Sequence, residues 1–302
     1  MKALITGGLG FVGTQLSTHL LEKGHKVTIV DHAARPHSRT PRAVKYVSGD
    51  TTAEGAWQDE VGKQDAIINL AGASIFRRWT EETKKLIYGS RILTTRNVVV
   101  AIGQERDVTL CSASAMGYYG FRGDEKLAEG NEPGDDFLAR LCIDWENEAG
   151  KASSKGARVA VTRFGIVLGK TGGALGQMIP AFKRFVGGPL GSGNQWFSWI
   201  HMEDLPRAIL FVLDTHDLEG PVNLCSPNPV RNKELAKALG EILGRPSFLK
   251  APGFMMRAIL GEFGSVLLEG QRVIPDRLLR AGFAFHYTEL MQALREVIVG
   301  NK

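Results

Sequence analysis

The chain has 302 residues, of which 43% are hydrophobic and 23% are charged, the balance of an ordinary soluble globular protein. The net charge of +5 is scattered, without the basic stripe and interleaved aromatic residues that nucleic-acid binding requires. No apolar run approaches the ~20 residues that span a bilayer, and Gly7 and Gly8 interrupt the apolar start that a signal peptide would need. We therefore expect a cytoplasmic protein that binds neither nucleic acid nor membrane. Its three widely spaced cysteines, without a CxxC pair, fit reduced thiols.

Short apolar runs alternate with amphipathic segments in the first 170 residues. Buried strands are predicted at 2–6, 26–31, 45–50, 66–72, 108–115 and 158–169. Helices are predicted at 10–25, 81–104 and 135–153. Alternation of this kind predicts an α/β fold with a doubly wound parallel sheet. Ligands of such sheets bind beyond the carboxyl ends of the strands.

The pattern loosens after residue 170. Glycine and tryptophan are frequent at 187–205, followed by a helix at 203–214, a strand at 221–225 and an amphipathic helix at 232–243. We therefore expect a nucleotide-binding domain at 1–170 and a smaller substrate-side cap at 171–302, interleaved with the last strand of the sheet.

The stretch ITGGLGFVG follows the first predicted strand and spaces Gly7, Gly10 and Gly13 three residues apart. Gly7 permits a tight turn, Gly10 allows the backbone to approach a pyrophosphate, and Gly13 lets the helix pack closely on the strand. The pyrophosphate would rest on the helix N-terminus, where free N–H groups attract anions. Because the loop lies inside a β-α-β unit, it predicts dinucleotide binding by Gly7, Gly10, Phe11, Val12 and Gly13.

Two residues bear on the identity of the dinucleotide. Asp31 ends the second predicted strand, 18 residues after Gly13, where an acid binds the adenosine ribose and favours NAD(H). Arg35 follows four residues later, where a guanidinium can bind the 2′-phosphate of NADP(H). The residues themselves leave NAD and NADP open.

Further cofactor contacts are expected where later strands end. Asp50 follows the third strand and can accept a hydrogen bond from the adenine amino group. Small residues after the fourth strand leave room for the second ribose, so we add Leu70, Ala71 and Gly72 to the predicted cofactor site.

Several of these stretches carry a family resemblance. TGGLGFVG, NLAG and SASAMGYYG resemble the extended short-chain dehydrogenase/reductases. WTEETKKLIYGSRILTTRNVV, GDDFLARLCIDWE, RFGIVLGKTGGAL, WFSWIHMEDL and GQRVIPDRLLRAGF resemble its atypical NAD-dependent epimerase/dehydratase-like branch. The resemblance implies a Rossmann-like fold, a preference for NADP(H) and a family-specific C-terminal domain at about 250–298. Asp31 departs from it, since NADP-preferring proteins usually avoid an acid at that position.

The resemblance also defines what is missing. Superfamily enzymes use a tyrosine and a lysine four residues later, whose charge lowers the tyrosine's pKa for proton transfer. None of the five tyrosines of this chain is followed by such a lysine. By resemblance Phe137 takes the place of the tyrosine and Leu141 that of the lysine, and neither can carry a proton.

The remaining candidates for chemistry lie at other strand ends. Ser114 matches the superfamily's serine, and Tyr118 or Tyr119 can supply a phenol from the loop above it; alternatively, one of them stacks under the nicotinamide or packs in the cap. By resemblance Arg163 points toward the nicotinamide. Trp199 and His201 are predicted to line the substrate pocket, although a histidine in such a segment also commonly orders a loop.

Two functions of different classes follow. The first is an NAD(P)-dependent oxidoreductase or epimerase acting on a small carbonyl, sugar or nucleotide-sugar-like substrate without the usual Tyr-Lys pair. The alternative is a non-catalytic dinucleotide-binding protein that senses redox state or binds a partner. No metal site is expected, and the long helices at 81–104 and 135–153 can either cover the sheet or pair in a homodimer.

Overall fold

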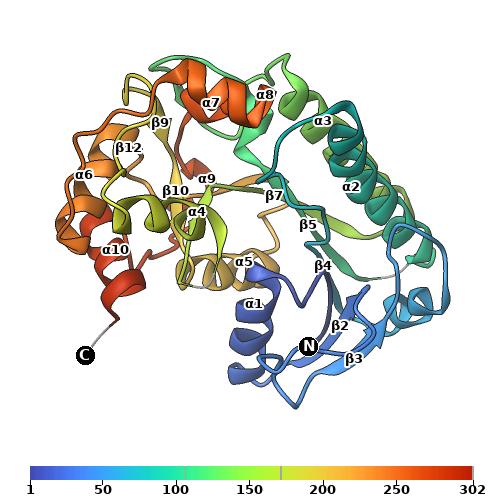
Figure 1. Cartoon of the computed structure of the whole chain (residues 1–302). Helices are drawn as coiled ribbons and strands as arrows, with labels where there is room; N and C mark the ends of the chain where they lie inside the picture. The colour runs from blue at the N-terminus through green and yellow to red at the C-terminus, as the bar shows by residue number, and fades with distance from the viewer. Residues whose placement is uncertain (106, 171, 301–302) are drawn as a thin grey trace.

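A sheet of seven parallel strands forms the centre of the computed structural model, in the order β11-β7-β5-β4-β1-β2-β3 (Figure 1). Its strands are β1 (Lys2–Thr6), β2 (Lys26–Asp31), β3 (Lys45–Ser48), β4 (Ala66–Asn69), β5 (Thr109–Ala115), β7 (Arg158–Phe164) and β11 (Gly220–Leu224). The order in which the strands are added reverses at β1, and open α/β sheets bind ligands beyond the carboxyl ends of the strands at such a reversal. The predicted α/β fold is confirmed.

The structure describes residues 1–105, 107–170 and 172–300. Residue 171, at the predicted domain boundary, and residues 301–302, at the end of the predicted cap, lie outside the described residues.

Helices cover both faces of the sheet because successive side chains of a buried strand point to opposite faces. Ala3 and Ile5 of β1 belong to a cluster that includes α1 (Phe11–Glu22) and α5 (Asp204–Asp214). Leu4, between them, belongs to a second cluster that includes α2 (Glu81–Ala101) and α3 (Phe137–Gly150). The described helices α2 and α3 pack against each other on this second face.

The helices on the second face begin at side-chain caps that the sequence supplies. The Thr80 hydroxyl accepts a hydrogen bond from the Thr83 N–H at the start of α2. The Asp136 carboxylate accepts one from the Ala139 N–H at the start of α3. Each cap satisfies one of the N–H groups that a first helical turn leaves unpaired.

The predicted strand at 158–169 is two strands. β7 ends at Phe164, and β8 (Ile166–Leu168) pairs with β10 (Trp199–His201) outside the main sheet. The chain changes sheets at Gly165, where an added Cβ would lie 3.0 Å from the Cβ of Cys225. This close approach explains the glycine, and the switch carries the chain from the sheet into the cap.

The cap combines short strands with helices around its own apolar cluster. That cluster contains Leu168, Trp199, Leu239 and Leu294. The remaining elements of the chain are η1 (Ala56–Lys63), η2 (Met116–Tyr119), β6 (Lys126–Leu127), η3 (Lys151–Lys155), α4 (Gly173–Lys183), β9 (Trp196–Phe197), β12 (Val230–Arg231), α6 (Asn232–Leu243), α7 (Gly253–Leu260), α8 (Glu262–Leu268), β13 (Arg272–Val273), α9 (Asp276–Arg280) and α10 (Leu290–Val299). Between α5 and α6 the chain returns to the main sheet as β11. No helix in the described ranges has the length and apolar character needed to cross a membrane.

Candidate functional site

The glycine loop is a tight turn held by backbone contacts. Gly7 has φ +67°, and its N–H donates to the Val30 carbonyl at 2.9 Å. An added Cβ at Gly13 would lie 2.6 Å from the Gly8 Cα, so α1 packs directly on the loop. Gly10 caps α1 without a side-chain hydrogen bond. The helix therefore offers its uncapped N-terminus at the end of β1, an arrangement that binds phosphate oxygens.

The phenyl ring of Phe11 joins this loop to the cap. A Cβ added at Gly169 or at Gly173 would lie only 2.8 Å from an atom of this ring. Gly173, with φ +63°, begins α4. The glycines of the GKTGGALG stretch thus let α4 start against the cofactor loop, a role that the sequence analysis did not assign.

Asp31 is held by the protein itself. The carboxylate is 8% exposed; Oδ2 accepts the Leu9 N–H at 3.1 Å, and Oδ1 lies 3.0 Å from Nδ1 of His32. Arg35 is exposed, and no ion pair engages it within the described part of the chain. The acid thus fixes the glycine loop, while the guanidinium beside it stays available.

Asp50 lies on the surface after β3. Its carboxylate accepts hydrogen bonds from the Thr52 N–H at 2.9 Å and the Thr52 hydroxyl at 2.7 Å. These hydrogen bonds lower the pKa of Asp50 below its ordinary value. The carboxylate closes a local turn, which is also an ordinary role for an aspartate at this position.

The end of β4 lies against the glycine loop. An added Cβ at Gly7 would stand 2.8 Å from the Ala71 Cα. The Thr6 hydroxyl donates to Asn69 Oδ1 at 2.7 Å and accepts the Leu70 N–H at 3.2 Å. The predicted cofactor residues of β1 and β4 are therefore brought together, with Gly72 exposed beside them.

Ser114 opens a buried polar network at the end of β5. Its hydroxyl donates to Glu146 Oε1 at 2.6 Å, and both oxygens of Glu146 bind Arg163, at 2.9 Å and 2.8 Å. Arg163 Nη1 also donates to the Tyr119 hydroxyl at 3.0 Å. The Tyr119 hydroxyl in turn donates to Asn223 Oδ1 at 2.7 Å. Strands β5, β7 and β11 and helix α3 thus meet in one chain of hydrogen bonds.

This network determines what its members can do. Tyr119 is fully buried, and burial raises the pKa of its phenol well above the ordinary value, so it stays protonated at neutral pH. The bidentate contact with Glu146 raises the pKa of Arg163. The partly exposed Tyr118 places its ring centre 3.4 Å from the Arg163 guanidinium carbon. Tyr118, which is partly exposed, borders the carboxyl ends of the strands, while Ser114, Tyr119 and Arg163 lie buried beneath it.

The positions matched to the missing tyrosine and lysine are apolar. Phe137 packs edge-on against Trp79 with ring centres 5.3 Å apart, and Leu141 is 3% exposed in the same cluster. No proton can be exchanged through either side chain. Glu146, one helical turn beyond Leu141, is the ionisable residue that α3 brings to Ser114, and sequence reasoning missed it although it ends the quoted stretch GDDFLARLCIDWE.

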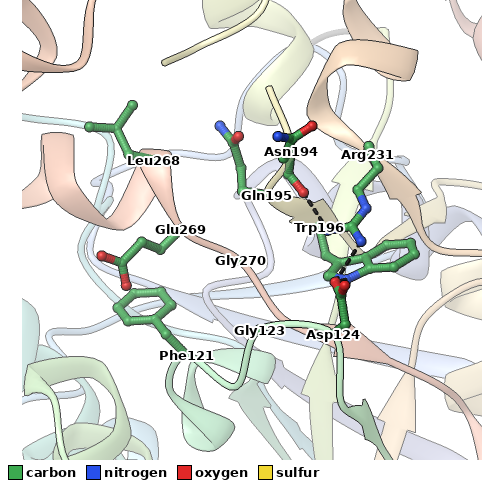
Figure 2. Close-up of a pocket in the computed structure, with 10 residues that line it drawn as sticks. All are labelled: Phe121, Gly123, Asp124, Asn194, Gln195, Trp196, Arg231, Leu268, Glu269 and Gly270. Carbon is green, nitrogen blue, oxygen red and sulfur yellow. Dashed lines mark hydrogen bonds and ion pairs between the residues drawn. The ribbon is translucent and has the colours of Figure 1, made fainter. Parts of the chain in front are cut away.

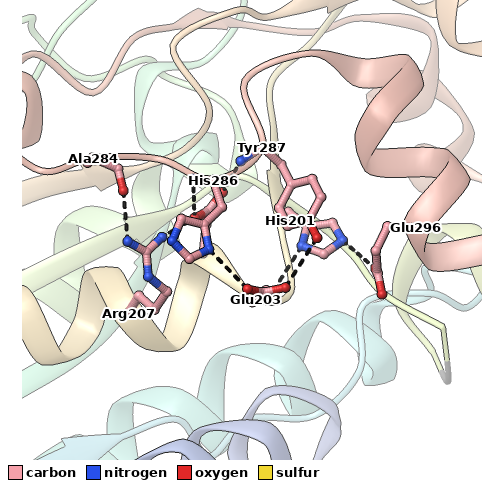
Figure 3. A network of polar contacts seen from close by, with 8 residues as sticks. His201, Glu203, Arg207, Ala284, His286, Tyr287 and Glu296 are labelled. Atoms are coloured by element: carbon pink, nitrogen blue, oxygen red, sulfur yellow. Dashed lines mark hydrogen bonds and ion pairs between the residues drawn. The ribbon is translucent and has the colours of Figure 1, made fainter. Parts of the chain in front are cut away.

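Trp199 and His201 lie in the interior of the cap. Trp199 is fully buried, and its indole N–H donates to the Asn228 carbonyl at 3.1 Å. His201 Nε2 lies 2.9 Å from Glu296 Oε2, and Nδ1 accepts the Glu203 N–H at 3.1 Å (Figure 3). The imidazole lies against Tyr287, with ring centres 3.8 Å apart. Burial lowers the pKa of His201. Neither residue lines the cavity in Figure 2.

That cavity lies where the loop at 121–124 meets the cap, between β9, β12 and the end of α8 (Figure 2). It measures about 240 Å³. The Trp196 ring forms one wall, with the guanidinium carbons of Arg231 and Arg272 3.8 Å and 4.6 Å from its centre. Asp124 neutralises Arg231 at 2.5 Å. The cavity is thus polar but largely paired within itself, and the glycine loop does not line it.

Comparison with known proteins identifies the family to which the chain belongs. A model of the NAD dependent epimerase/dehydratase family matches residues 3–225. The chain belongs to that family. A second model, a domain of unknown function (DUF1731), matches residues 251–297, in agreement with the C-terminal domain expected at about 250–298.

Several epimerase family proteins are similar to the chain over nearly its whole length. The chain is 42% identical over 302 residues to an epimerase family protein SDR39U1 homolog, chloroplastic, of Arabidopsis thaliana, covering 99% of this chain and 87% of the relative. It is 38% identical over 307 residues to the epimerase family protein YfhF of Bacillus subtilis, covering 100% and 99%. The crystal structure of human epimerase family protein SDR39U1 with NADPH superimposes with a TM-score of 0.86 at 34% identity, covering 100% of both chains. The resemblance read from the sequence is confirmed.

Removing the Glu146 carboxylate leaves the buried Arg163 without its counter-charge. We expect Glu146→Ala to lower the free energy of unfolding by about 3–5 kcal/mol, the usual cost of breaking a buried pair from one side. Glu241→Ala is the matched control, because its pair with Arg295 is exposed and worth less than about 1 kcal/mol. Urea denaturation measures both variants, and equal effects would contradict the structural role of the network.

The lowered pKa of His201 predicts a loss of stability in mild acid. Its pKa is lowered in the folded protein, so below the unfolded value of 6.5 the unfolded chain binds the extra proton more readily. We expect His201→Asn to show a smaller fall in the free energy of unfolding from pH 7.5 to pH 5 than the wild type shows. Denaturant titrations at both pH values measure the free energy of unfolding of the two proteins. An equal fall in the variant and the wild type would refute the role given to His201.

Proposed function

We propose that the protein binds NADP(H) at the glycine loop and catalyses hydride transfer at a carbonyl or alcohol carbon of a small, sugar or nucleotide-sugar-like substrate. The observation that carries this proposal is the direct packing of the loop's glycines against α1 and against the end of β4. Such a junction leaves an uncapped helix N-terminus and open backbone at the sheet crevice, where a dinucleotide lies in folds of this class.

The charges around Asp31 support NADP(H) over NAD(H). Both carboxylate oxygens of Asp31 are engaged, by the Leu9 N–H and by the neighbouring His32, so the acid is already bound within the protein. Arg35 stands free on the surface nearby, with the exposed Arg39 behind it. A guanidinium without a carboxylate partner suits a 2′-phosphate, which it can bind bidentately. The human relative whose structure carries NADPH is consistent with this choice.

The polar residues beyond β5 would serve the substrate oxygen. NADP(H), when bound, supplies or accepts the hydride. Ser114 holds its hydroxyl at the strand end through Glu146, and Tyr118 lies over the Arg163 guanidinium. We assign to Tyr118 the hydrogen bond that polarises the reacting oxygen. Ser114 and Tyr119 support it from below, because their hydroxyl protons are committed to Glu146 and to Asn223.

One observation favours the second candidate function, a dinucleotide-binding protein without turnover. Phe137 and Leu141 lie in a closed apolar cluster with Trp79 and Phe263, where a working enzyme of the superfamily would hold its proton-transfer pair. Such a protein would bind the cofactor and signal its presence to a partner.

Isotope transfer separates the two functions. NADPH carrying deuterium at the reactive C4 position is incubated with the protein and with aldehydes, ketones, sugars and nucleotide sugars, and products are analysed by mass spectrometry. The catalytic proposal expects deuterium in at least one product. Saturable NADPH binding without transfer across the whole panel would overturn it in favour of the non-catalytic function.

Arg35 tests the choice of cofactor. Losing a charge-assisted hydrogen bond costs about 1.5–3 kcal/mol, so Arg35→Ala should weaken NADPH binding by roughly 10- to 150-fold and leave NADH binding unchanged. Fluorescence titration with each nucleotide gives both affinities. The exposed Arg245→Ala, on the cap, is the control and should change neither. An equal loss for both nucleotides, or no loss, contradicts a 2′-phosphate contact.

A further inference from the structure

Arg91 of α2 places a guanidinium near the carboxyl ends of the central strands β4 and β5. Its Nη1 donates to the Ala73 carbonyl at 3.1 Å and to the Ile87 carbonyl at 3.0 Å. An added Cβ at Gly72 would stand 3.0 Å from its Cζ and 3.3 Å from its Nε. On the other side, the guanidinium carbon lies 5.3 Å from the centre of the Trp145 ring. The group is thus wedged between the loop after β4 and helix α3.

No carboxylate compensates this charge. Among the described residues no acid lies within ion-pair distance of Arg91, and its hydrogen bonds use Nη1 alone. Arg163 and Arg158 use their donors differently. Arg163 binds both oxygens of Glu146, and Arg158 spends Nη1 and Nη2 on carbonyls at the end of α5 and beyond it. Arg91 keeps Nε and Nη2 unused, two donors that form a fork suited to an oxyanion.

Partial burial makes the lack of a counter-charge costly. Removal from water lowers the pKa of Arg91 to about 10, and its described partners, two backbone carbonyls and the Trp145 ring, carry no negative charge. A guanidinium of this kind is stabilised when an anion supplies the missing partner. In the free protein the group lies beside the end of β4, which the proposed function places next to the cofactor.

The position of Arg91 identifies which molecule brings that anion. Gly72 follows β4, and Cys142 contacts the Ala115 carbonyl at the end of β5, so Arg91 lies between these two strand ends. In the proposed complex the nicotinamide would lie there, because the residue assigned to the substrate oxygen follows β5. The cofactor's pyrophosphate is assigned to the start of α1 and its 2′-phosphate to Arg35. We infer that Arg91 binds a carboxylate or phosphate oxyanion of the substrate through Nε and Nη2. This inference rests on the proposed function, since it places the substrate beside that cofactor.

Chemical modification tests the site without requiring turnover. Phenylglyoxal reacts with accessible guanidinium groups, and peptide mass spectrometry reports the rate at Arg91 in the NADPH-saturated protein. We expect inorganic phosphate and pyruvate to slow modification of Arg91 at least fivefold, while methyl pyruvate, which lacks the charge, does not. Protection by one anion and not the other identifies phosphate or carboxylate as the group recognised. An unreactive Arg91, or protection by neither anion, overturns the inference.

Variants of Arg91 provide the second measurement. Phosphate and pyruvate should raise the melting temperature of the NADPH-bound wild type and of Arg96→Met, the matched control on the exposed face of α2. Arg91→Met should lose this anion-dependent rise, and Arg91→Lys, which keeps the charge but not the fork, should retain part of it. Arg91→Lys also guards against a folding defect, because Arg91 holds the Ala73 carbonyl.

NADPH titration of the same samples separates the two proposals. NADPH binding that persists without any anion effect refutes the oxyanion site alone. Absence of NADPH binding in the wild type refutes the proposed function itself.

Discussion

The contact between the glycine loop and the end of β4 is the constraint on which the rest of the site depends. Gly7 and Gly13 leave no room for a Cβ, since the nearest backbone atoms would stand 2.8 Å and 2.6 Å away. Because α1, β1 and β4 approach this closely, the uncapped helix N-terminus, the Asp31 carboxylate and the strand ends lie together beyond the carboxyl end of β1. Backbone packing rather than side-chain chemistry thus creates the cofactor site.

The polar residues around this site differ from the tyrosine–lysine pair that the resemblance implies. The helix that by resemblance would carry a tyrosine and a lysine carries Phe137 and Leu141, which are sealed in an apolar cluster. The same helix brings Glu146 to Ser114 and Arg163, and α2 brings Arg91 to the neighbouring strand edge. One of these two arginines is neutralised and the other is not. That asymmetry gives the site a positive charge at the place where a substrate would lie.

The sequence predicted the fold well because hydrophobic periodicity is a local signal. The parallel sheet and the helices on its faces followed from it, and the glycine spacing marked the loop. The break of the strand at Gly165 was missed, since it depends on Cys225, distant in the chain.

The side-chain network was harder to predict for the same reason. The Glu146–Arg163 pair joins α3 to β7, and Asn223 of β11 completes it; no spacing within a segment reveals such contacts. The burial of Trp199 and the pairing of His201 with Glu296 likewise depend on how the cap folds around them. A crystal structure of the protein with NADPH would test the account most directly. We predict the pyrophosphate at the start of α1, the 2′-phosphate toward Arg35, and the nicotinamide between the ends of β4 and β5. A dinucleotide bound elsewhere, in the cap cavity for example, would contradict it.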